Sequence, residues 1–464
     1  MDLKIKKEIF REYDIRGVVG QDLDQNLAAI IGRAIATKIK KAGRKRMAVG
    51  RDCRLSSPLL FSGLTEGLLS SGVQVIDLGV VPTPLVYFTS YYFREEAAVV
   101  ITGSHNPPEF NGFKIMIGEE TLHGAEILDI YRIIERGEFI TPAQRGQMTA
   151  FDPVPEYINY VASQIHLDRP VKVVLDAGNG TAGPVAVSLF KKLGAEVVEL
   201  YTDMDGRFPH HHPDPTLPEA LEDLISTVRA TGAEAGLAYD GDADRLGAVD
   251  EAGHIIWGDQ LMIIFARDLL PSHPGAAIIS EVKASHLLYD EIRRLGGRPI
   301  MWKTGHSLIK EKIRQEKALL AGEMSGHIFF ADRWFGFDDA IYASARLVEI
   351  ISRQMKKLSA YLADLPPVYN TPEIRIYTSD EVKFKVVDGV KEKLSQLPEI
   401  KQLIDIDGVR AVFDHGWGLV RASNTQPVIV LRFEADSQEE LSRIEQKIKS
   451  TLEEVLTGLN SKKK

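Results

Sequence analysis

The sequence predicts three consecutive, similar α/β domains followed by a smaller α+β domain. The first observation behind this prediction is a repeat of three apolar strand-like segments, each followed by a segment with helical potential: Met47 to Val49, Val171 to Leu175 and Ala276 to Ser280. In each repeat a glycine then ends the helix and leads into a second strand, at Gly72, Gly194 and Gly296. With 464 residues, the chain is also too long for one core and predicts about three or four domains.

The second observation is that each repeat supplies one further strand with a polar motif directly after it. These strands are Ala97 to Ile101, Ala235 to Tyr239 and Leu319 to Ala321. Open α/β sheets bind ligands at the carboxyl ends of their strands. We therefore expect each of the three units to present one motif to a ligand.

The last part of the chain departs from the repeat. From Tyr369 onward we expect a strand, a charged helix, two alternating strands around a loop that begins at Arg421, and a final helix from Gln438. Pro-rich or polar joints give four predicted domains, at residues 1–152, 153–253, 254–367 and 368–464.

The first motif presents a serine as a candidate covalent phosphate carrier. The strand that ends at Ile101 opens into Thr102-Gly103-Ser104-His105-Asn106-Pro107-Pro108, in which the glycine permits a sharp exit and the prolines fix the next turn. A serine hydroxyl is a weak nucleophile, and His105, Arg16 and Lys114 are candidates for activating it. Taken alone, an ordinary Ser/Asn turn explains these residues better.

The second motif places three carboxylates in one tight turn, at Asp240, Asp242 and Asp244. Carboxylates at this spacing repel one another unless a cation lies among them, and all-oxygen ligation suits Mg²⁺. An EF-hand is excluded because Arg245 stands where the sixth position requires glycine, so a solvated acidic turn is the remaining alternative. Arg245 could orient the carboxylates or bind a phosphoryl group.

The third and fourth motifs suit a sugar and a phosphate. Glu323 and Ser325 can hydrogen-bond vicinal hydroxyls, and His327 titrates close enough to neutrality to transfer a proton. A guanidinium, two hydroxyls and an amide suit a phosphate dianion, and they belong to Arg421, Ser423, Asn424 and Thr425. Taken alone, an ordinary polar turn with a hydrogen-bonded histidine explains the third motif better, and the fourth is a common hairpin loop that is not specific without the others.

Together, and in this order, the four motifs resemble those of the α-D-phosphohexomutase family. The match begins at Phe10-Arg11-Glu12-Tyr13-Asp14-Ile15-Arg16-Gly17 and extends to the phosphate loop, so it covers nearly the whole chain. The segment Gly322-Glu323-Met324-Ser325-Gly326-His327 is similar to the sugar loop of the bacterial phosphomannomutase/phosphoglucomutase branch.

The resemblance implies mixed sheets around a central active-site cleft and a reversible transfer of phosphate between the 1- and 6-positions of hexose phosphates. It implies a phosphoserine at Ser104, which would also be a ligand of Mg²⁺, and a hexose 1,6-bisphosphate as activator and intermediate. Ser104, His105, Arg16, Lys114 and His327 would act in catalysis. The residues expected to bind substrate are Tyr13, Arg245, Lys283, His306, Glu323, Ser325, Arg421, Ser423, Asn424 and Thr425.

Composition excludes several other classes of protein. Hydrophobic residues make up 44% and charged residues 26%, which is typical of a globular chain, and the formal net charge of −9 argues against nucleic acid or an anionic membrane as a partner. The one cysteine excludes an internal disulfide, and the charged start is unlike a secretory signal. We therefore expect a cytoplasmic enzyme of small hexose phosphates that acts as a monomer, with oligomerisation left open.

Three alternatives remain at this point. A phosphoglucosamine mutase shares the motifs but usually has glutamine at the position of Met324. A non-catalytic sugar-phosphate-binding homologue should have lost the serine or an aspartate, and a phosphatase would transfer the phosphoryl group to water.

Overall fold

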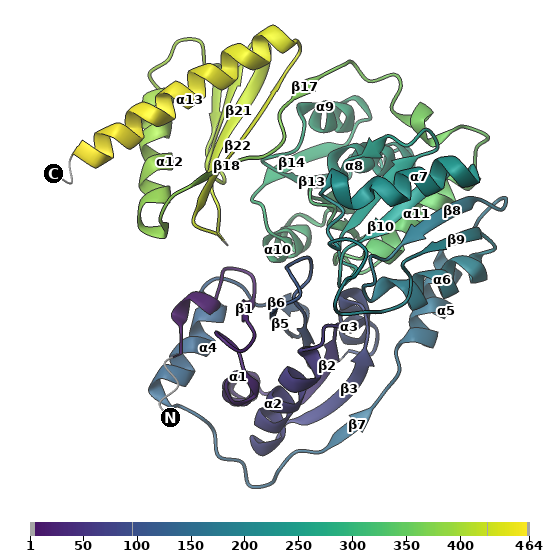
Figure 1. Cartoon of the computed structure of the whole chain (residues 1–464), viewed down its shortest axis with the longest axis vertical. Coiled ribbons are helices and arrows are strands. Elements are labelled where there is room, and N and C mark those ends of the chain that lie inside the picture. Colours follow the sequence, from purple (N-terminus) through teal and green to yellow (C-terminus); the bar gives the residue numbers. More distant parts are fainter. Residues whose placement is uncertain (1–4, 95, 425, 462–464) are drawn as a thin grey trace. The chain divides into compact units, whose positions relative to one another are not determined.

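The computed structural model describes residues 5–94, 96–424 and 426–461 (Figure 1). These residues divide into two units. Unit 1 is drawn from Met1–Ile279, Glu291–Pro299 and Gly305–Ala363, and unit 2 from Ser280–Asp290, Ile300–Thr304 and Asp364–Lys464.

The first sheet has the strand order β1-β5-β4-β2-β3-β7, with β6 paired to β5. It is mixed, because β2 runs parallel to β3 and β4 whereas β5 runs antiparallel to β4. Its strands are β1 (Ile15–Val18), β2 (Arg46–Arg51), β3 (Gln74–Val80), β4 (Ala97–Ile101), β5 (Phe110–Ile117), β6 (Glu120–Thr121) and β7 (Met148–Ala150). The helices of this region are the 3₁₀ helix η1 (Lys7–Ile9), α1 (Gln25–Lys41), α2 (Ser57–Ser70), α3 (Thr83–Tyr92) and α4 (Ala125–Arg136).

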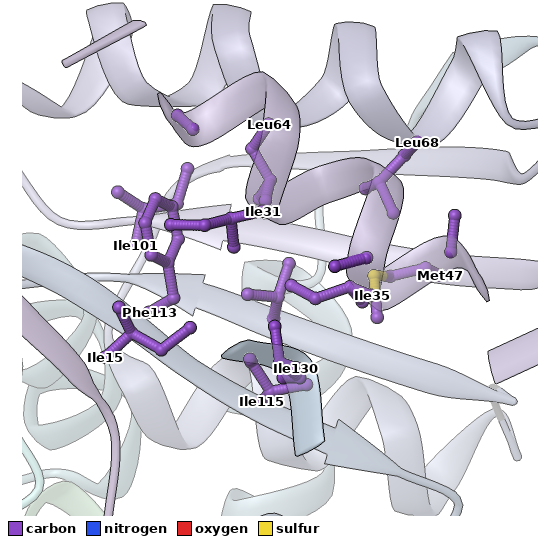
Figure 2. Close-up of a cluster of buried hydrophobic side chains, with 14 of the residues drawn as sticks. Ile15, Ile31, Ile35, Met47, Leu64, Leu68, Ile101, Phe113, Ile115 and Ile130 are labelled. Carbon is purple, nitrogen blue, oxygen red and sulfur yellow. The ribbon is translucent and has the colours of Figure 1, made fainter. Parts of the chain in front are cut away.

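Helices α1, α2 and α4 cover one face of this sheet with a continuous apolar core. Figure 2 shows Ile31 of α1 beside Ile101 and Phe113 of the sheet, with Leu64 of α2 next to Ile31, and Ile35 of α1 beside Met47 of β2. Helix α1 begins where the Asp24 carboxylate accepts a hydrogen bond from the Leu27 amide at 2.7 Å. Helices α1 and α2 pack closely because α2 carries Gly67, where an added Cβ would lie 2.1 Å from the Ala29 carbonyl oxygen of α1.

The second sheet is also mixed, with the order β12-β11-β10-β8-β9. Strand β10 is parallel to β8 and antiparallel to β11, so β10 and β11 form a hairpin whose turn carries the aspartate motif. The strands are β8 (Lys172–Asp176), β9 (Glu196–Leu200), β10 (Ala235–Tyr239), β11 (Leu246–Asp250) and β12 (Ile255–Ile256). The helices are α5 (Val154–Gln164), α6 (Ala182–Leu193), the 3₁₀ helix η2 (Pro218–Leu221) and α7 (Glu222–Thr231).

The third sheet has the order β14-β13-β15-β16, and the sugar motif connects the antiparallel pair β15 and β16. Its strands are β13 (Ala277–Glu281), β14 (Arg298–Trp302), β15 (Leu320–Gly322) and β16 (Ile328–Phe330). The helices are α8 (Gly258–Leu269), α9 (His286–Arg294), α10 (His306–Glu316), α11 (Ala340–Ser352) and the 3₁₀ helix η3 (Leu358–Tyr361).

The fourth sheet, in unit 2, is antiparallel, with the order β17-β22-β21-β20-β19 and β18 paired to β22. Helices α12 and α13, green and yellow in Figure 1, share one apolar core with this sheet. The elements are β17 (Tyr369–Asn370), β18 (Ile374–Tyr377), α12 (Asp380–Leu394), β19 (Gln402–Ile404), β20 (Val409–Phe413), β21 (Gly416–Ala422), β22 (Val428–Ala435) and α13 (Gln438–Ser461).

The sequence-based prediction for this last region gave too few strands: it had one strand before α12 where the structure has β17 and β18, and it missed β19 and β21. The strand β21 is the one that bears on the site. We expected Arg421 at the start of a loop between two strands, whereas it is the penultimate residue of the additional strand β21. Asp414 and His415 turn the chain from β20 directly into β21, where Trp417, Leu419 and other residues are buried between the neighbouring strands. The two glycines at the start of β21 hide its strand pattern, because glycine is depleted in strands.

Within the described ranges, no helix is both long and apolar enough to cross a membrane.

The start of α11 gives a testable prediction about stability. Asp339 caps this helix by accepting a hydrogen bond from the Tyr342 amide at 2.8 Å, and the Tyr157 hydroxyl donates to the same carboxylate. Burial raises the pKa of Asp339 to about 7. Because the pKa is higher in the folded than in the unfolded chain, this group's favourable contribution is present below about pH 4 and is lost as the pH rises through about 7.

Asp339→Asn keeps a cap and removes the buried charge. We expect it to raise the melting temperature by about 2–4 °C at pH 8 relative to wild type, with a smaller or reversed difference at pH 5. Asp388→Asn, on the exposed side of α12, is the matched control and should shift neither value. If Asp339→Asn differed from wild type by the same amount at both pH values, the titration of Asp339 would be contradicted.

Candidate active site

Ser104 lies in a loop directly after β4, with its side chain aimed at the aspartate turn. Its backbone φ of +50° is in the left-handed region that residues other than glycine rarely adopt. Its amide donates to the Thr102 hydroxyl at 2.8 Å. Its own hydroxyl oxygen is 2.9 Å from Oδ2 of Asp240, and Ser104 is only 3% exposed. The loop therefore presents the predicted nucleophile to the predicted metal ligands.

The three aspartates of the β10–β11 turn are fully buried and converge. Asp240 organises the turn, because its Oδ1 accepts hydrogen bonds from the Asp244 amide at 3.0 Å and the Arg245 amide at 3.2 Å. One carboxylate oxygen from each of Asp240, Asp242 and Asp244 lies within 4.8 Å of the others. Burial, together with the neighbouring carboxylates, raises the pKa of Asp240 well above its usual value.

Lys114 of β5 compensates part of this buried negative charge. Its Nζ is 2.7 Å from Oδ2 of Asp242 and also donates to Oδ2 of Asp244. Burial alone would lower the pKa of Lys114, but the two carboxylates outweigh it and hold the pKa well above its usual value. The Thr83 hydroxyl also donates to Asp242, at 2.6 Å.

The aspartate turn contains carboxylate oxygens that are free to bind a divalent cation. Among the described residues, Oδ1 of Asp242 and Oδ1 of Asp244 are buried without a hydrogen-bond partner. Buried carboxylate oxygens without partners are costly unless a cation binds them. A ligand set made only of oxygen atoms suits Mg²⁺. Asp240, Asp242, Asp244 and the Ser104 hydroxyl are therefore the residues that could hold the metal.

Arg16 and His105 contact the Ser104 loop from outside and from within it, respectively. Nη1 of Arg16, on β1, donates to the Gly103 carbonyl at 2.8 Å and to the Asn106 side chain at 2.7 Å, while Nη2 pairs with Asp14. Nδ1 of His105 is 3.2 Å from the Ser104 hydroxyl. Burial and then the charges of Arg245 and Arg16 hold the pKa of His105 well below its usual value, so its imidazole is neutral.

His327 is the residue directly before β16 and contacts both Arg245 and Asp338. Nε of Arg245 donates to Nε2 of His327 at 3.1 Å, so Nε2 carries a lone pair. The proton is therefore on Nδ1, which is 3.0 Å from Oδ2 of Asp338 and 3.6 Å from Oδ1 of Asp244. Burial lowers the pKa of His327, but these two carboxylates reverse the shift and raise it.

The predicted sugar-binding residues of unit 1 lie beside His327. Glu323 is buried, and its Oε1 accepts a hydrogen bond from the Gly305 amide at 2.6 Å. The His306 ring stacks on His327 at 5.5 Å and is 6.0 Å from the ring of Tyr13. Ser325 is partly exposed in the turn between β15 and β16. Unit 1 thus brings together the predicted residues from the first three motifs.

Unit 2 contains the remaining predicted residues in two charged clusters. Nζ of Lys283 is 2.7 Å from Oε1 of Glu373. Nε of Arg421 is 2.6 Å from Oδ2 of Asp407, which also accepts the Thr304 amide at 3.0 Å.

The turn after β21 contains the other three predicted phosphate ligands. The Ser423 hydroxyl accepts a hydrogen bond from the Gln426 amide at 3.2 Å. Asn424 is partly exposed, and Thr425 lies outside the described residues.

Sequence reasoning missed the partners of these groups. Asp338 contacts His327 and accepts a hydrogen bond from Lys310 at 3.0 Å, and Asp407 holds Arg421. The Asp338-Asp339 pair directly before the apolar helix α11 was a usable signal, because a helix needs only one capping aspartate. Asp407 stands in an ordinary Asp-Gly turn, which gives no such signal.

Comparisons with known proteins agree with this geometry. Four phosphoglucomutase/phosphomannomutase family models match the chain: alpha/beta/alpha domain I at residues 7–141, domain II at 155–253, domain III at 257–369 and the C-terminal domain at 381–450. These models confirm the predicted fold class of three α/β domains and a smaller C-terminal domain.

Individual relatives match over nearly their whole length. A phosphomannomutase/phosphoglucomutase of Pseudomonas aeruginosa is 47% identical, over 97% of this chain and 96% of the relative. A phosphoglucomutase of Neisseria meningitidis serogroup A is also 47% identical, over 97% of both chains. The crystal structure of a phosphoglucomutase/phosphomannomutase family protein from Burkholderia thailandensis has a TM-score of 0.92 and 44% identity, and covers 98% of this chain and 99% of that one. The chain therefore belongs to the phosphoglucomutase/phosphomannomutase family.

Proposed function

We propose that this protein is a hexose phosphate mutase that moves a phosphoryl group between the 1- and 6-positions of glucose or mannose phosphates, with Ser104 as the phosphoryl carrier. The observation that carries the proposal is the Ser104 hydroxyl, which lies 2.9 Å from Oδ2 of Asp240 in a cluster of three buried aspartates. The loop that carries Ser104 is also bound by Arg16, through the Gly103 carbonyl. Family membership supports the same reaction, because the relatives are named for it.

In the proposed reaction, phosphorylated Ser104 gives its phosphoryl group to the free hydroxyl of a hexose monophosphate. The bond from phosphorus to Oγ of Ser104 breaks as the bond to the sugar oxygen forms, giving a hexose 1,6-bisphosphate. The bisphosphate then reorients in the site and transfers its other phosphoryl group to Ser104, so no phosphate is consumed. A bound Mg²⁺ on Asp240, Asp242 and Asp244 would balance negative charge on the reacting phosphoryl group.

The chain's own residues provide the remaining chemistry. Lys114, bonded to Asp242 of the aspartate turn, and Arg16, bonded to the Gly103 carbonyl, are the proposed sources of positive charge near the leaving oxygen of Ser104. Nε2 of His327 is the proposed acceptor of the sugar hydroxyl proton, which it returns in the second half of the cycle. Since Nε of Arg245 donates to this nitrogen in the structure, Arg245 would have to release it on binding the reacting phosphate.

Other residues are proposed to hold the substrate. Tyr13, His306, Glu323 and Ser325 would contact the sugar, Lys283 would help to choose its orientation, and Arg245 would bind the reacting phosphate. The non-reacting phosphate would be bound by Arg421, Ser423, Asn424 and Thr425, which offer charge-assisted and neutral donors.

Arg421 gives a prediction that separates binding from chemistry. Arg421→Ala removes a charge-assisted, two-pronged contact worth about 1.5–3 kcal/mol, so KM should rise about ten- to a hundredfold. The free bisphosphate should also escape more often, whereas Ser104 should still accept a phosphoryl group from added bisphosphate. Arg375→Ala is the control, because Arg375 is exposed on β18, which pairs with β22 and not with β21. If KM and bisphosphate release were both unchanged in Arg421→Ala, a residue other than Arg421 would bind the non-reacting phosphate.

A single assay distinguishes the proposed mutase from the alternatives. The purified protein is given mannose 1-phosphate with Mg²⁺ and a trace of the bisphosphate. The 6-phosphate isomer is expected, whereas free phosphate would indicate a phosphatase and binding without turnover would indicate a sensor. Repeating the assay with glucose and glucosamine 1-phosphates gives the sugar preference, and a preference for glucosamine would contradict the proposed branch.

We also propose that the domains meet near residues 152, 253 and 367. The second of these positions coincides with the end of one matched range, and the first lies between two matched ranges, which supports the division. The cytoplasmic location and the monomeric state stay predictions.

A further inference from the structure

Arg54 is a fully buried arginine whose guanidinium faces the main chain of the Ser104 loop. Nη2 donates to the carbonyl oxygens of Ser104 at 2.7 Å and Asn106 at 2.6 Å. Nη1 donates to those of Pro107 at 2.6 Å and Phe110 at 3.1 Å. One side chain outside the loop thus binds three of its backbone carbonyls and that of Phe110, the first residue of β5.

Asp52 binds the other side of the same loop and fixes Arg54. Its Oδ2 accepts hydrogen bonds from the Gly103 amide at 3.0 Å and from Nε of Arg54 at 3.1 Å. Its Oδ1 accepts the Arg54 amide at 3.0 Å and the Ser57 hydroxyl at 2.5 Å. The Asp52–Arg54 ion pair therefore binds the loop backbone in two ways: Asp52 accepts a hydrogen bond from an amide, and Arg54 donates to carbonyls.

The loop is shaped around this guanidinium. A Cβ added to Gly103 would lie 2.5 Å from Cζ and from Nε of Arg54, so only glycine fits between the arginine and the loop. The next residue, Ser104, has the unfavourable φ of +50° that aims its hydroxyl at Asp240. A backbone in a disfavoured conformation persists only where its surroundings hold it there.

We propose that Arg54, fixed by Asp52, is a positioning residue that holds the Ser104 loop in the conformation needed for phosphoryl transfer. This inference rests on the proposed role of Ser104 as the phosphoryl carrier. Neither side chain needs to touch substrate, because Arg54 acts through the backbone on the position of the Ser104 hydroxyl. Misplacing a reacting group by about 1 Å can slow a reaction a hundredfold.

The test compares Arg54→Lys with Arg51→Lys. Lysine keeps the charge but has a single nitrogen, which cannot reach four carbonyls with the geometry of the planar guanidinium. Arg51 lies at the end of β2, pairs with Asp77 at 2.7 Å and is the matched control. Arg54→Lys should lower kcat about ten- to thirtyfold with KM within about twofold of wild type, and Arg51→Lys should change neither.

Hydrogen exchange provides a readout that is independent of activity. In Arg54→Lys, the amides of residues 103–106 should exchange faster than in wild type, while those of β2 and β4 keep their protection. If Arg54→Lys does not fold, Asp52→Asn carries the same test, because it leaves Arg54 in place and weakens the contacts to Gly103 and Nε.

The outcomes separate this inference from the proposed function. If the wild type is active, and the folded variant has the same kcat and the same hydrogen exchange in the loop, only the positioning role would be overturned. A higher KM with unchanged kcat would also overturn it, since Arg54 would then act in binding. A wild type that neither isomerises hexose phosphates nor carries phosphate on Ser104 would overturn both.

Discussion

Replacing Ser104 with alanine should reduce mutase activity at least about a thousandfold, because the reaction would lose the group that carries the phosphoryl between the two sugar positions. The substitution removes one hydroxyl and keeps a small side chain, so the fold should be unaffected. Steady-state turnover of glucose 1-phosphate with added bisphosphate measures the loss, and circular dichroism checks the fold.

The control for this variant is Ser70→Ala, in the last turn of α2, where the hydroxyl donates to the Gly67 carbonyl in the preceding turn of its own helix at 3.2 Å. This control should retain wild-type turnover. A Ser104→Ala enzyme that isomerises substrate at more than a few per cent of the wild-type rate would contradict the carrier role, whatever its stability.

The second large effect is expected from Asp242→Asn. The substitution removes one of three convergent carboxylates, one oxygen of which is buried without a partner among the described residues. Loss of a residue that merely supports a metal ligand already costs about 10- to 100-fold in affinity or activity, so loss of a ligand should lower kcat about 100- to 1,000-fold. Mg²⁺ affinity, measured by calorimetry without substrate, should fall as well.

Asp250→Asn is the matched control for this metal prediction. Asp250 is also buried, at the other end of β11, but its carboxylate accepts local hydrogen bonds from the Ala252 and His254 amides and contacts the His254 imidazole at 3.1 Å. The control should leave Mg²⁺ affinity unchanged even if it lowers stability. Wild-type turnover that survives both Asp242→Asn and complete chelation would rule out the metal role.

Much of the fold and the site could be predicted because the key residues follow strands. Ser104, the aspartates and Glu323 each follow a short apolar segment of the sequence. Each segment forms a strand, namely β4, β10 and β15, so these residues lie at the carboxyl ends of strands, where ligands bind. Strands β4 and β10 were predicted with their observed bounds, because fully buried strands appear as continuous apolar runs bounded by turn residues.

The supporting residues could not be predicted, because their roles depend on long-range contacts. Arg54 bonds to a loop about fifty positions later, and Asp338 contacts a histidine on the other side of β16. Nothing in the local sequence of Arg54 distinguishes a buried, paired charge from an exposed one. The Asp338-Asp339 pair before α11 indicates one aspartate beyond the cap, but it does not identify His327 as the partner. The strand β21 was missed for a different reason, since its glycines weaken the alternating pattern on which the prediction depends.

The most direct test of the account is to map the phosphate on the enzyme itself. Purified protein is incubated with glucose 1,6-bisphosphate and Mg²⁺, digested and analysed by mass spectrometry, before and after a chase with glucose 6-phosphate. The account predicts one phosphoryl group on the peptide that contains Ser104, and its loss to the sugar during the chase. Phosphate on a different residue, or turnover with no phosphorylated enzyme at any stage, would contradict it.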